Sequence, residues 1–214
     1  MSVHLRPEEI EAESFRIIDA EVGPHLWSPA EWPVVRRVIH TSADFEYSRS
    51  MSFSRDAVAR GVVAIRQGRG IVTDTTMALA GISKPRLDTF AIASSCLVAD
   101  PVVAKVAAKF GVTRSIVAMR TAAADPSNGI FVIGNAPTAL FELLRLVREE
   151  GLRPGLVVGL PVGFVGAAES KEELVREAGA YDIPFITNRG RKGGSNVAAA
   201  VINALLIMAE EGRF

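Results

Sequence analysis

The segment "VIHTSADF" (38–45) places a histidine after an apolar run and before small polar residues. Imidazole groups titrate near pH ~6.5 in solution, so His40 is a candidate to donate or accept a proton at neutral pH. A buried, hydrogen-bonded structural histidine fits the same pattern. The chain contains no G-x-S-x-G motif, which argues against a hydrolase triad. If the protein is an enzyme, His40 would act as a single acid/base.

A second chemical motif is the loop "NRGRKGGSN" (188–196), which combines Arg189, Arg191 and Lys192 with glycines. It follows a predicted strand and opens a predicted helix, and the N-terminus of a helix favours anions. The loop therefore predicts a carboxylate or phosphate site. A solvated turn with Ser195 as N-cap is the alternative. Neither G-x-x-x-x-G-K-[ST] nor a G-x-G-x-x-G fingerprint after a strand occurs, which argues against the common nucleotide sites.

Two further loops carry residues of interest. "GLPVGFVGAAESKEE" (159–173) is rich in glycine and could form a backbone-lined wall against a large flat ligand, or merely a flexible connection. "IGNAPTALFEL" (133–143) offers Asn135 as an N-cap with Pro137 in the first helical turn. We expect Asn135 to serve mainly structure while also facing the site.

Short apolar strands alternating with helices must position these loops. This alternation predicts an α/β fold, a three-layer α/β/α sandwich with a mainly parallel sheet of about five strands. Ligands of such sheets bind beyond the carboxyl ends of the strands, where Asp74 and Thr75 also lie. The strands are expected at 70–74, 89–94, 129–135, 155–160 and 183–188. The helices are expected at 7–23, 28–39 (with Ser28 as N-cap), 54–68, 75–82, 100–111, 115–125, 137–151, 170–179 and 195–212.

Composition excludes several classes. The 214 residues carry 24 basic and 24 acidic side chains, without the basic stripe of a duplex nucleic-acid binder. No apolar run reaches the ~18–20 residues of a membrane span, and the N-terminus lacks the apolar segment of a secretion signal. Cys96 is the only cysteine, so a reducing cytoplasm is the simplest compartment. One histidine and one cysteine far apart argue against a dedicated zinc site.

Seven ordered segments carry a family resemblance. They are "ESFRIID" (13–19), "VIHTSADF" (38–45), "DTTMALAGI" (74–82), "GVTRS" (111–115), "VIGNAPTAL" (132–140), "GLPVGFVGAAESKE" (159–172) and "ITNRGRKGGSNVAAAVINAL" (186–205). With these segments the chain resembles the precorrin-8X methylmutase family of cobalamin biosynthesis, including its cobalt-precorrin-8 members. The resemblance covers nearly the whole chain and implies one domain over residues 1–214.

The resemblance implies an isomerase without nucleotide, flavin or metal cofactor. Such enzymes move a methyl group from ring carbon eleven to ring carbon twelve of precorrin-8 or cobalt-precorrin-8, giving the hydrogenobyrinic or cobyrinic acid skeleton. The resemblance maps the catalytic histidine onto His40 and a substrate-binding serine onto Ser14. It also implies an α/β/α sandwich and a homodimer.

The macrocycle bears many carboxylates, which Arg114, Arg191, Lys192 and the N-terminus of the last helix could bind. We include Thr41, Asp74, Thr75, Asn135, Gly163, Gly193 and Gly194 as further substrate-binding candidates. A non-catalytic tetrapyrrole carrier would use the same edges without needing His40. A nucleotide-dependent α/β enzyme using the "GRKGG" loop is a weaker alternative, because both phosphate motifs are absent.

Two sequence features add to the expectation of a dimer. The final helix, 195–212, is apolar around much of its circumference, which suggests burial on more than one side. Trp27 and Trp32 lie beside prolines, and aromatic residues are enriched at interfaces. The alternative is that both tryptophans pack under the N-terminal helices of their own subunit.

Overall fold

Six strands form one sheet in the computed structural model, which describes residues 6–212. Their order is β1–β6–β5–β4–β2–β3, with β2 to β6 parallel and β1 antiparallel to β6 at one edge. The strands are β1 (Met51–Phe53), β2 (Gly70–Thr73), β3 (Ser94–Ser95), β4 (Asn128–Ile133), β5 (Leu156–Gly159) and β6 (Phe185–Asn188). The predicted mainly parallel sheet is confirmed, and the carboxyl ends of the parallel strands share one edge.

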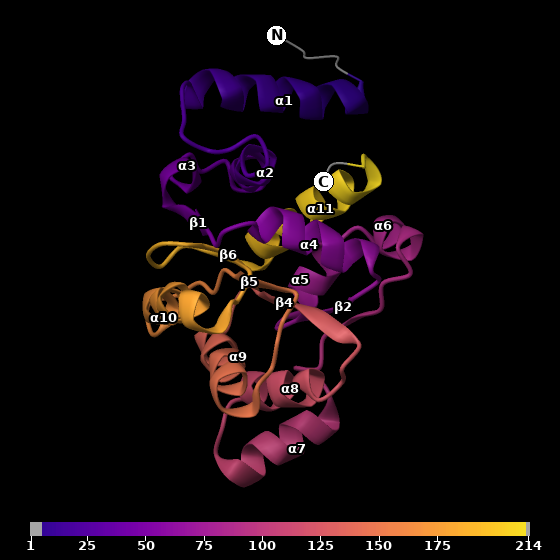
Figure 1. Cartoon of the computed structure of the whole chain (residues 1–214), viewed down its shortest axis with the longest axis vertical. Helices are drawn as coiled ribbons and strands as arrows, with labels where there is room; N and C mark the ends of the chain where they lie inside the picture. The colour runs from indigo at the N-terminus through magenta and orange to yellow at the C-terminus, as the bar shows by residue number, and fades with distance from the viewer. Residues whose placement is uncertain (1–5, 213–214) are drawn as a thin grey trace.

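Helices cover both faces of this sheet (Figure 1). One side carries α2, α4, α5, α6 and α11, and the other carries α8, α9 and α10, with α7 packed on α8. The helices are α1 (Pro7–Val22), α2 (Trp32–Ser42), α3 (Tyr47–Ser50), α4 (Ala57–Arg66), α5 (Thr76–Gly81), α6 (Lys84–Thr89), α7 (Pro101–Phe110), α8 (Arg114–Ala123), α9 (Pro137–Glu150), α10 (Ala167–Tyr181) and α11 (Ser195–Glu210). The predicted α/β/α layering is confirmed.

Alternation along β4 shows how one strand serves two cores. Ile130 and Val132 join the cluster that includes α2, α4 and α11, whereas Phe131 and Ile133 join the cluster of α8, α9 and α10. Successive strand side chains point to opposite faces, so a strand covered on both sides must be apolar throughout. This explains why the strands read as short, continuous apolar runs.

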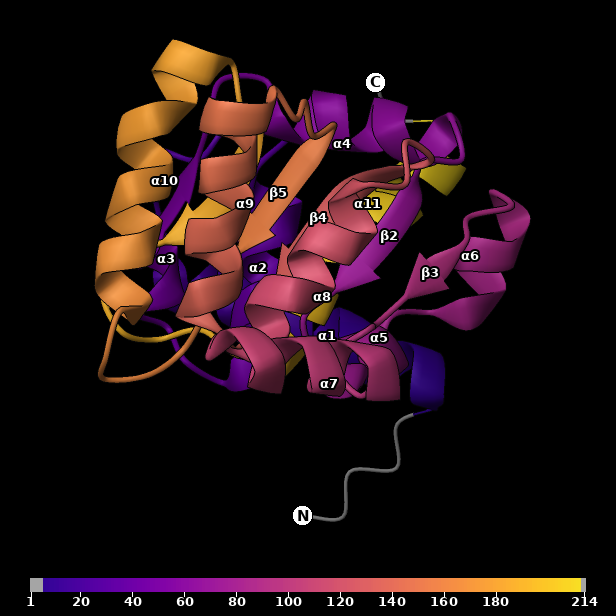
Figure 2. The same cartoon turned by 90° about the horizontal axis from the view of Figure 1, so that it is seen from below.

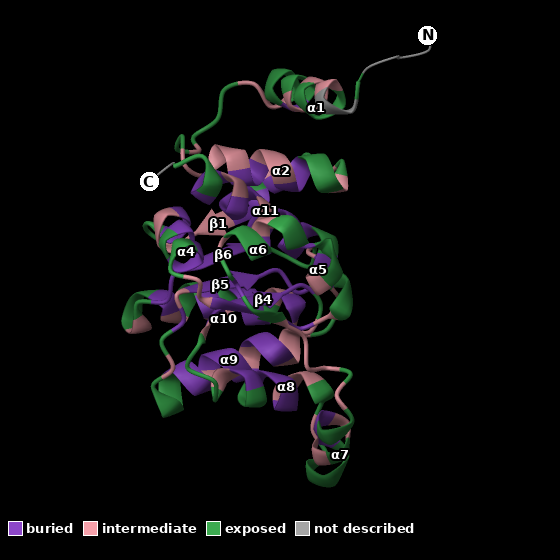
Figure 3. Cartoon of the chain, turned by 90° about the vertical axis from the view of Figure 1, so that its right-hand side faces the viewer, coloured by how far each residue is buried: buried purple, intermediate pink, exposed green. Residues whose placement is uncertain are grey.

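Helix α11 is apolar around much of its circumference because other elements of the same chain bury it. Twelve of its residues are buried, because the helix lies against the sheet and is covered by α2, α4 and α5. Figure 3 shows the resulting stack, with α2 above α11 and α1 above α2. The inference from this helix to a subunit interface therefore loses its support.

Both tryptophans also pack within their own chain. Trp27 Nε1 donates to the carbonyl of Ser48 at 2.9 Å, and Trp32 Nε1 donates to Asp19 Oδ1 at 3.0 Å. The second bond ties α2 to α1. The intramolecular alternative for the tryptophans thus holds.

The sheet departs from the prediction at its edges. β1 and the short helices α3 and α6 were not predicted, and the segment expected as a strand at 89–94 is largely wrong. Residues 84–89 form α6, and only Ser94–Ser95 pair with β2. Edge strands make half the ladder bonds of a central strand, so their sequences carry a weaker signal.

The second helix begins later than expected. Its N-cap is Glu31 rather than Ser28, and Pro33 falls in the first turn, where a missing N–H costs nothing and causes no kink. Ser28 caps the turn before the helix instead, since its Oγ accepts the backbone N–H of Glu31 at 3.3 Å and donates to Glu31 Oε2 at 2.8 Å. None of the described helices combines the length and apolarity needed to cross a membrane.

Candidate active site

Four loops meet at the carboxyl edge of the sheet. They follow β2, β4, β5 and β6 and lead into α5, α9, α10 and α11. In Figure 2 the strands run toward the lower part of the picture, where α5, α7 and the first turns of α9 and α10 lie. Every loop that the sequence analysis selected therefore lies at this edge.

Asp74 joins the β2 loop to the β4 loop. Its two carboxylate oxygens accept the backbone N–H groups of Gly134, Asn135 and Ala136 at 2.8, 2.9 and 2.7 Å. The side chain is buried, and burial raises the pKa of its carboxyl group while the three N–H donors oppose that rise. Asp74 thus fixes the entry to α9.

This bonding corrects the predicted cap of α9. The N-cap is Ala136, and the Asn135 side chain makes no capping bond. Pro137 does lie in the first turn, as predicted. The Asp74 carboxylate accepts the three N–H groups before the helix, and Pro137, the first helical residue, has no N–H to satisfy. The exposed Asn135 side chain remains at the edge.

Close backbone approach joins the β6 loop to its neighbours. Thr75 Oγ1 and Ser195 Oγ lie 2.7 Å apart, and Thr75 caps α5 by accepting the N–H of Ala78. A Cβ on Gly134 would lie 2.7 Å from Ser195 Cα, and one on Gly193 would lie 2.6 Å from the Pro161 carbonyl oxygen. These glycines are therefore required for the loops to touch.

The N-cap of α11 is Gly194 rather than Ser195. Gly194 has φ of 135°, a conformation that other residues rarely adopt. Its N–H donates to the Leu160 carbonyl at 3.0 Å, and the N–H of Gly163 donates to the Arg191 carbonyl at 3.2 Å. The glycine-rich loop after β5 and the cationic loop after β6 thus form one continuous surface.

The three cations of the β6 loop differ in their surroundings. Lys192 Nζ lies 2.5 Å from Asp44 Oδ2 and 2.8 Å from Glu46 Oε2. Its hydrogen bond holds the pKa of the Asp44 carboxyl group below its usual value. Arg189 and Arg191 are exposed, and neither forms an ion pair with another described residue. Arg191 instead lies over the exposed Phe164 ring, 5.8 Å from its centroid.

His40 occupies the last turn of α2 and is exposed. It makes no hydrogen bond to the described residues, so the buried structural alternative is wrong. A small cavity of about 180 Å³ lies beside it, lined also by Thr41, Gly81 of α5, and Asn196 and Asn203 of α11. A ligand can therefore reach the His40 imidazole.

The first helix contacts His40 through Phe15, the residue that follows Ser14. Phe15, the next residue, meets the His40 ring edge-on with centroids 5.4 Å apart, and the Arg36 guanidinium lies 4.3 Å from the Phe15 centroid. Ser14 itself is partly exposed, and its hydroxyl donates to the Ile10 carbonyl within α1. Thr41 lines the same cavity as His40, and Ser14 adjoins Phe15 in the chain, so these three candidates form one group.

Arg114 lies apart from that group. It is the first residue of α8, and the hydrogen bond between Thr113 Oγ1 and Thr138 Oγ1, 3.0 Å, places the start of α8 beside the start of α9. These helices cover the face of the sheet opposite α2. The structure thus places Arg114 and His40 at the same edge but on opposite faces.

Sequence reasoning missed two buried residues of this edge. Tyr47 of α3 donates through its hydroxyl to the Gly193 carbonyl at 3.5 Å, and burial raises the pKa of its phenol to about 12. Lys171 of α10 donates a hydrogen bond through Nζ to the backbone carbonyl of Lys192 in the cationic loop. Lys171 lies in the segment "GAAESKEE" (166–173). A lysine between acidic residues of a predicted amphipathic helix is normally expected to be exposed to solvent, so the sequence did not indicate its burial.

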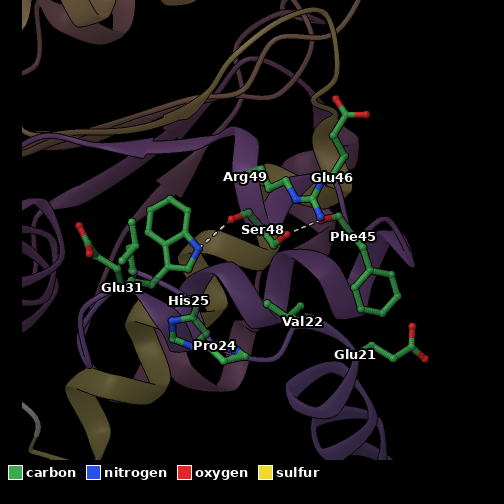
Figure 4. A pocket seen from close by; sticks show the side chains of 11 residues that line it. Glu21, Val22, Pro24, His25, Glu31, Phe45, Glu46, Ser48 and Arg49 are labelled. Carbon is green, nitrogen blue, oxygen red and sulfur yellow. Dashed lines mark hydrogen bonds between the residues drawn. The ribbon is translucent and has the colours of Figure 1, made fainter.

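The largest cavity described lies elsewhere. It measures about 910 Å³ and opens between the segment after α1 and helix α3. Figure 4 shows its lining, in which Pro24 and His25 face Phe45, Ser48 and Arg49. None of the predicted site residues lines it. Among the described residues, no group of three or more His, Cys, Asp or Glu side chains could hold a metal ion.

Three features meet at the carboxyl edge of the parallel sheet: an accessible histidine, a glycine-rich wall and exposed cations. Together they define an α/β protein built to act on a large anionic ligand. Comparison with known proteins specifies the class. The precorrin-8X methylmutase family model matches residues 9–208.

Relatives and solved structures agree with this match. The chain is 48% identical to the cobalt-precorrin-8 methylmutase of Priestia megaterium, over 97% of this chain and 91% of that protein. It is 47% identical to the cobalt-precorrin-8 methylmutase of Salmonella typhimurium, over 94% and 95%. The precorrin-8X methylmutase structure from Thermus thermophilus superposes with a TM-score of 0.88 at 43% identity, covering 96% of this chain and 98% of that one.

The chain belongs to the precorrin-8X methylmutase family. It is an isomerase of cobalamin biosynthesis that moves a methyl group within its substrate, and nothing in the comparisons favours a non-catalytic carrier.

Proposed function

We propose that the chain converts cobalt-precorrin-8 by moving the methyl group from ring carbon eleven to ring carbon twelve, with His40 as the proton donor and acceptor. The single observation that carries the role of His40 is an exposed imidazole that makes no hydrogen bond to the described residues, beside a cavity at the carboxyl edge. The names of the Priestia and Salmonella relatives support the cobalt-bearing substrate.

The chemistry needs little beyond a fixed ring and one proton. The bond from the methyl carbon to carbon eleven breaks as its bond to carbon twelve forms, and the electrons redistribute within the conjugated ring. A proton on a ring nitrogen selects the tautomer in which this shift is favourable. An imidazole suits that transfer, and holding the macrocycle still makes the step unimolecular in a fixed geometry.

Exposed cations support carboxylate binding at this edge. Arg191 and Arg114 have no acidic partner among the described residues and are exposed. A carboxylate placed between two N–H groups of a guanidinium gains directional, charge-assisted hydrogen bonds. Lys192 is less available, because Asp44 and Glu46 already neutralise it.

The loop after β5 supplies a surface for the flat ring. Phe164 and Val165 are 85% and 90% exposed next to Gly163 and Gly166. Large apolar side chains exposed at a site edge gain free energy when a ligand covers them. We propose that this loop contacts a face of the macrocycle, while Asp74, Thr75, Asn135, Gly193 and Gly194 shape the surrounding backbone.

We also propose a homodimer located in the cytoplasm. The family resemblance supports the dimer, and so do exposed apolar residues on and after α1, namely Ile10, Ile17 and the fully exposed Leu26. The single cysteine supports a reducing compartment. Light scattering tests the dimer, and a mass near the 22.9 kDa of one chain would contradict it.

The proposed reaction is tested with purified protein and both forms of the substrate. The methyl shift moves the saturated, methyl-bearing position of the ring from carbon eleven to carbon twelve. This changes the extent of the conjugated system, so the visible spectrum changes with turnover. We expect conversion of cobalt-precorrin-8 to be faster than that of metal-free precorrin-8. Binding of both forms without spectral conversion would contradict the proposed function, and faster conversion of the metal-free form would contradict the substrate preference.

A further inference from the structure

Lys171 is a buried lysine that has no part in the proposed methyl shift. It lies in the first half of α10 and is 1% exposed. Figure 1 shows α10 directly beside the end of the sheet that carries β6. The Lys171 side chain reaches from this helix to Asn188, the last residue of β6.

The Lys171 ammonium binds the loop that follows β6. Nζ donates to the Lys192 carbonyl at 2.6 Å and to Asn188 Oδ1 at 3.1 Å. Asn188 Nδ2 in turn donates to the same Lys192 carbonyl at 2.9 Å and to the Arg189 carbonyl at 3.1 Å. These four bonds clip the loop back onto the last residue of β6.

These contacts make little sense as a means of stabilising the fold. Lys171 forms no ion pair within residues 6–212, and both of its acceptors are neutral oxygens. Burial lowers the pKa of its ammonium group to about 8, so the buried charge costs free energy. An apolar side chain of similar length would fill the same space without that cost. The benefit must lie in the loop geometry that the lysine imposes.

Other contacts show what that geometry achieves. The Arg189 N–H donates to the Ser50 carbonyl at 2.8 Å, and the Arg191 carbonyl accepts from Gly163 at 3.2 Å. With the Lys192 carbonyl held by Lys171, the backbone oxygens of the loop bond to the protein while the Arg191 side chain stays exposed. An arginine on a fixed backbone loses less conformational entropy when it binds a carboxylate.

We propose that Lys171 is a positioning residue for substrate binding, which fixes residues 189–194 so that Arg191 is preorganised for a carboxylate of the macrocycle. This inference rests on the proposed function, since it assumes that the loop binds the substrate. Lys171 lies on the protein side of the loop and acts through the loop backbone.

Lys171→Met tests this proposal, because it keeps the length of the side chain and removes its donors. Lys105→Met, at an exposed position on α7, is the matched control. We expect Lys171→Met to raise KM about tenfold and to leave kcat within about twofold, as expected when the ground state and the transition state lose binding equally. Neither parameter should change in the control.

A second measurement examines the loop without the substrate. Trypsin can cleave after Arg189, Arg191 and Lys192, and loosening of the loop speeds that cleavage. We expect Lys171→Met to be cut at these three bonds at least about tenfold faster than the wild-type protein, with fragments assigned by mass spectrometry. If Lys171→Met does not fold, Lys171→Gln is measured instead, because it keeps an N–H donor without the charge.

Two outcomes would overturn the proposal. They are an unchanged KM in the folded variant, with or without a fall in kcat, and wild-type cleavage rates at the loop. Absence of turnover by the wild-type protein would contradict the proposed function. The cleavage rates would then still decide whether Lys171 holds the loop.

Discussion

Lys192 Nζ lies 2.5 Å from Asp44 Oδ2, an ion pair between the loop after β6 and the segment that follows the helix of His40. The two residues are 148 positions apart in the chain. The pair joins the proposed carboxylate-binding loop to the proposed proton donor. It also neutralises one of the cations from which the sequence predicted a substrate contact.

The ion pair sets an expectation for Lys192→Met. Because its charge is already shared with Asp44 and Glu46, its loss should weaken macrocycle binding by less than about 1 kcal/mol, the usual range for exposed pairs. Titration of the visible absorbance measures this. A loss as large as that of Arg191→Met would show that Lys192 leaves Asp44 to bind the substrate.

Arg191→Met should weaken substrate binding by about 1.5 to 3 kcal/mol, the value of a hydrogen bond to a charged group. Arg189→Met is the matched control, since Arg189 is also exposed but lines a groove beside α10 rather than lying over Phe164. The same absorbance titration compares the two variants. Equal effects would argue against a specific contact through Arg191.

His40→Asn should reduce kcat by a factor of about 10² to 10⁴, as expected for a general acid–base residue. The fold should persist, because the side chain is exposed and makes no hydrogen bond within residues 6–212. His25→Asn, at the large cavity, serves as the control and should retain activity. Ordinary turnover by His40→Asn would remove it from the mechanism and reopen the carrier hypothesis.

Asp74→Ala should lower the free energy of unfolding by at least about 3 kcal/mol, because three backbone N–H groups would lose their acceptor. Urea denaturation measures the change. Asp88→Ala, at an exposed position on α6, is the control and should change stability by less than about 0.5 kcal/mol. Similar values for both variants would show that solvent replaces the Asp74 carboxylate.

Lys171 predicts a pH dependence of stability. Its folded-state pKa is lowered from 10.5 to about 8, so between these values the unfolded chain binds more protons than the folded protein. Stability contributed by this group therefore rises with pH from about 8 to about 10.5 and is lowest below pH 8.

Comparison with Lys171→Met isolates this contribution, because other groups such as Tyr47 titrate in both proteins. The unfolding free energy of the wild type minus that of the variant should increase by on the order of 2 kcal/mol between pH 7 and pH 10, on the basis of ~1.4 kcal/mol per pKa unit. Unfolding by urea at several pH values provides the data. A difference independent of pH would show that the Lys171 ammonium is solvated.

Local sequence was sufficient to predict the central architecture. The apolar runs of β2, β4, β5 and β6 and the helices between them follow from periodicity, because a strand buried on both faces must be apolar throughout. The carboxyl edge as the location of the site follows from the parallel topology. The cationic glycine-rich loop was visible for the same reason, since glycine and charge after an apolar strand form a local pattern.

Only the tertiary structure decided how the residues at that edge are used. Asp74 is the acceptor for the entry to α9, and Lys171 binds Asn188, 17 residues after it, at the start of the loop that it fixes. Lys192 is paired to Asp44, and α11 is covered by helices of its own chain. Each of these relationships joins segments that are separated in sequence, and hydrophobic periodicity records only which face of an element is buried, not which polar partner it meets.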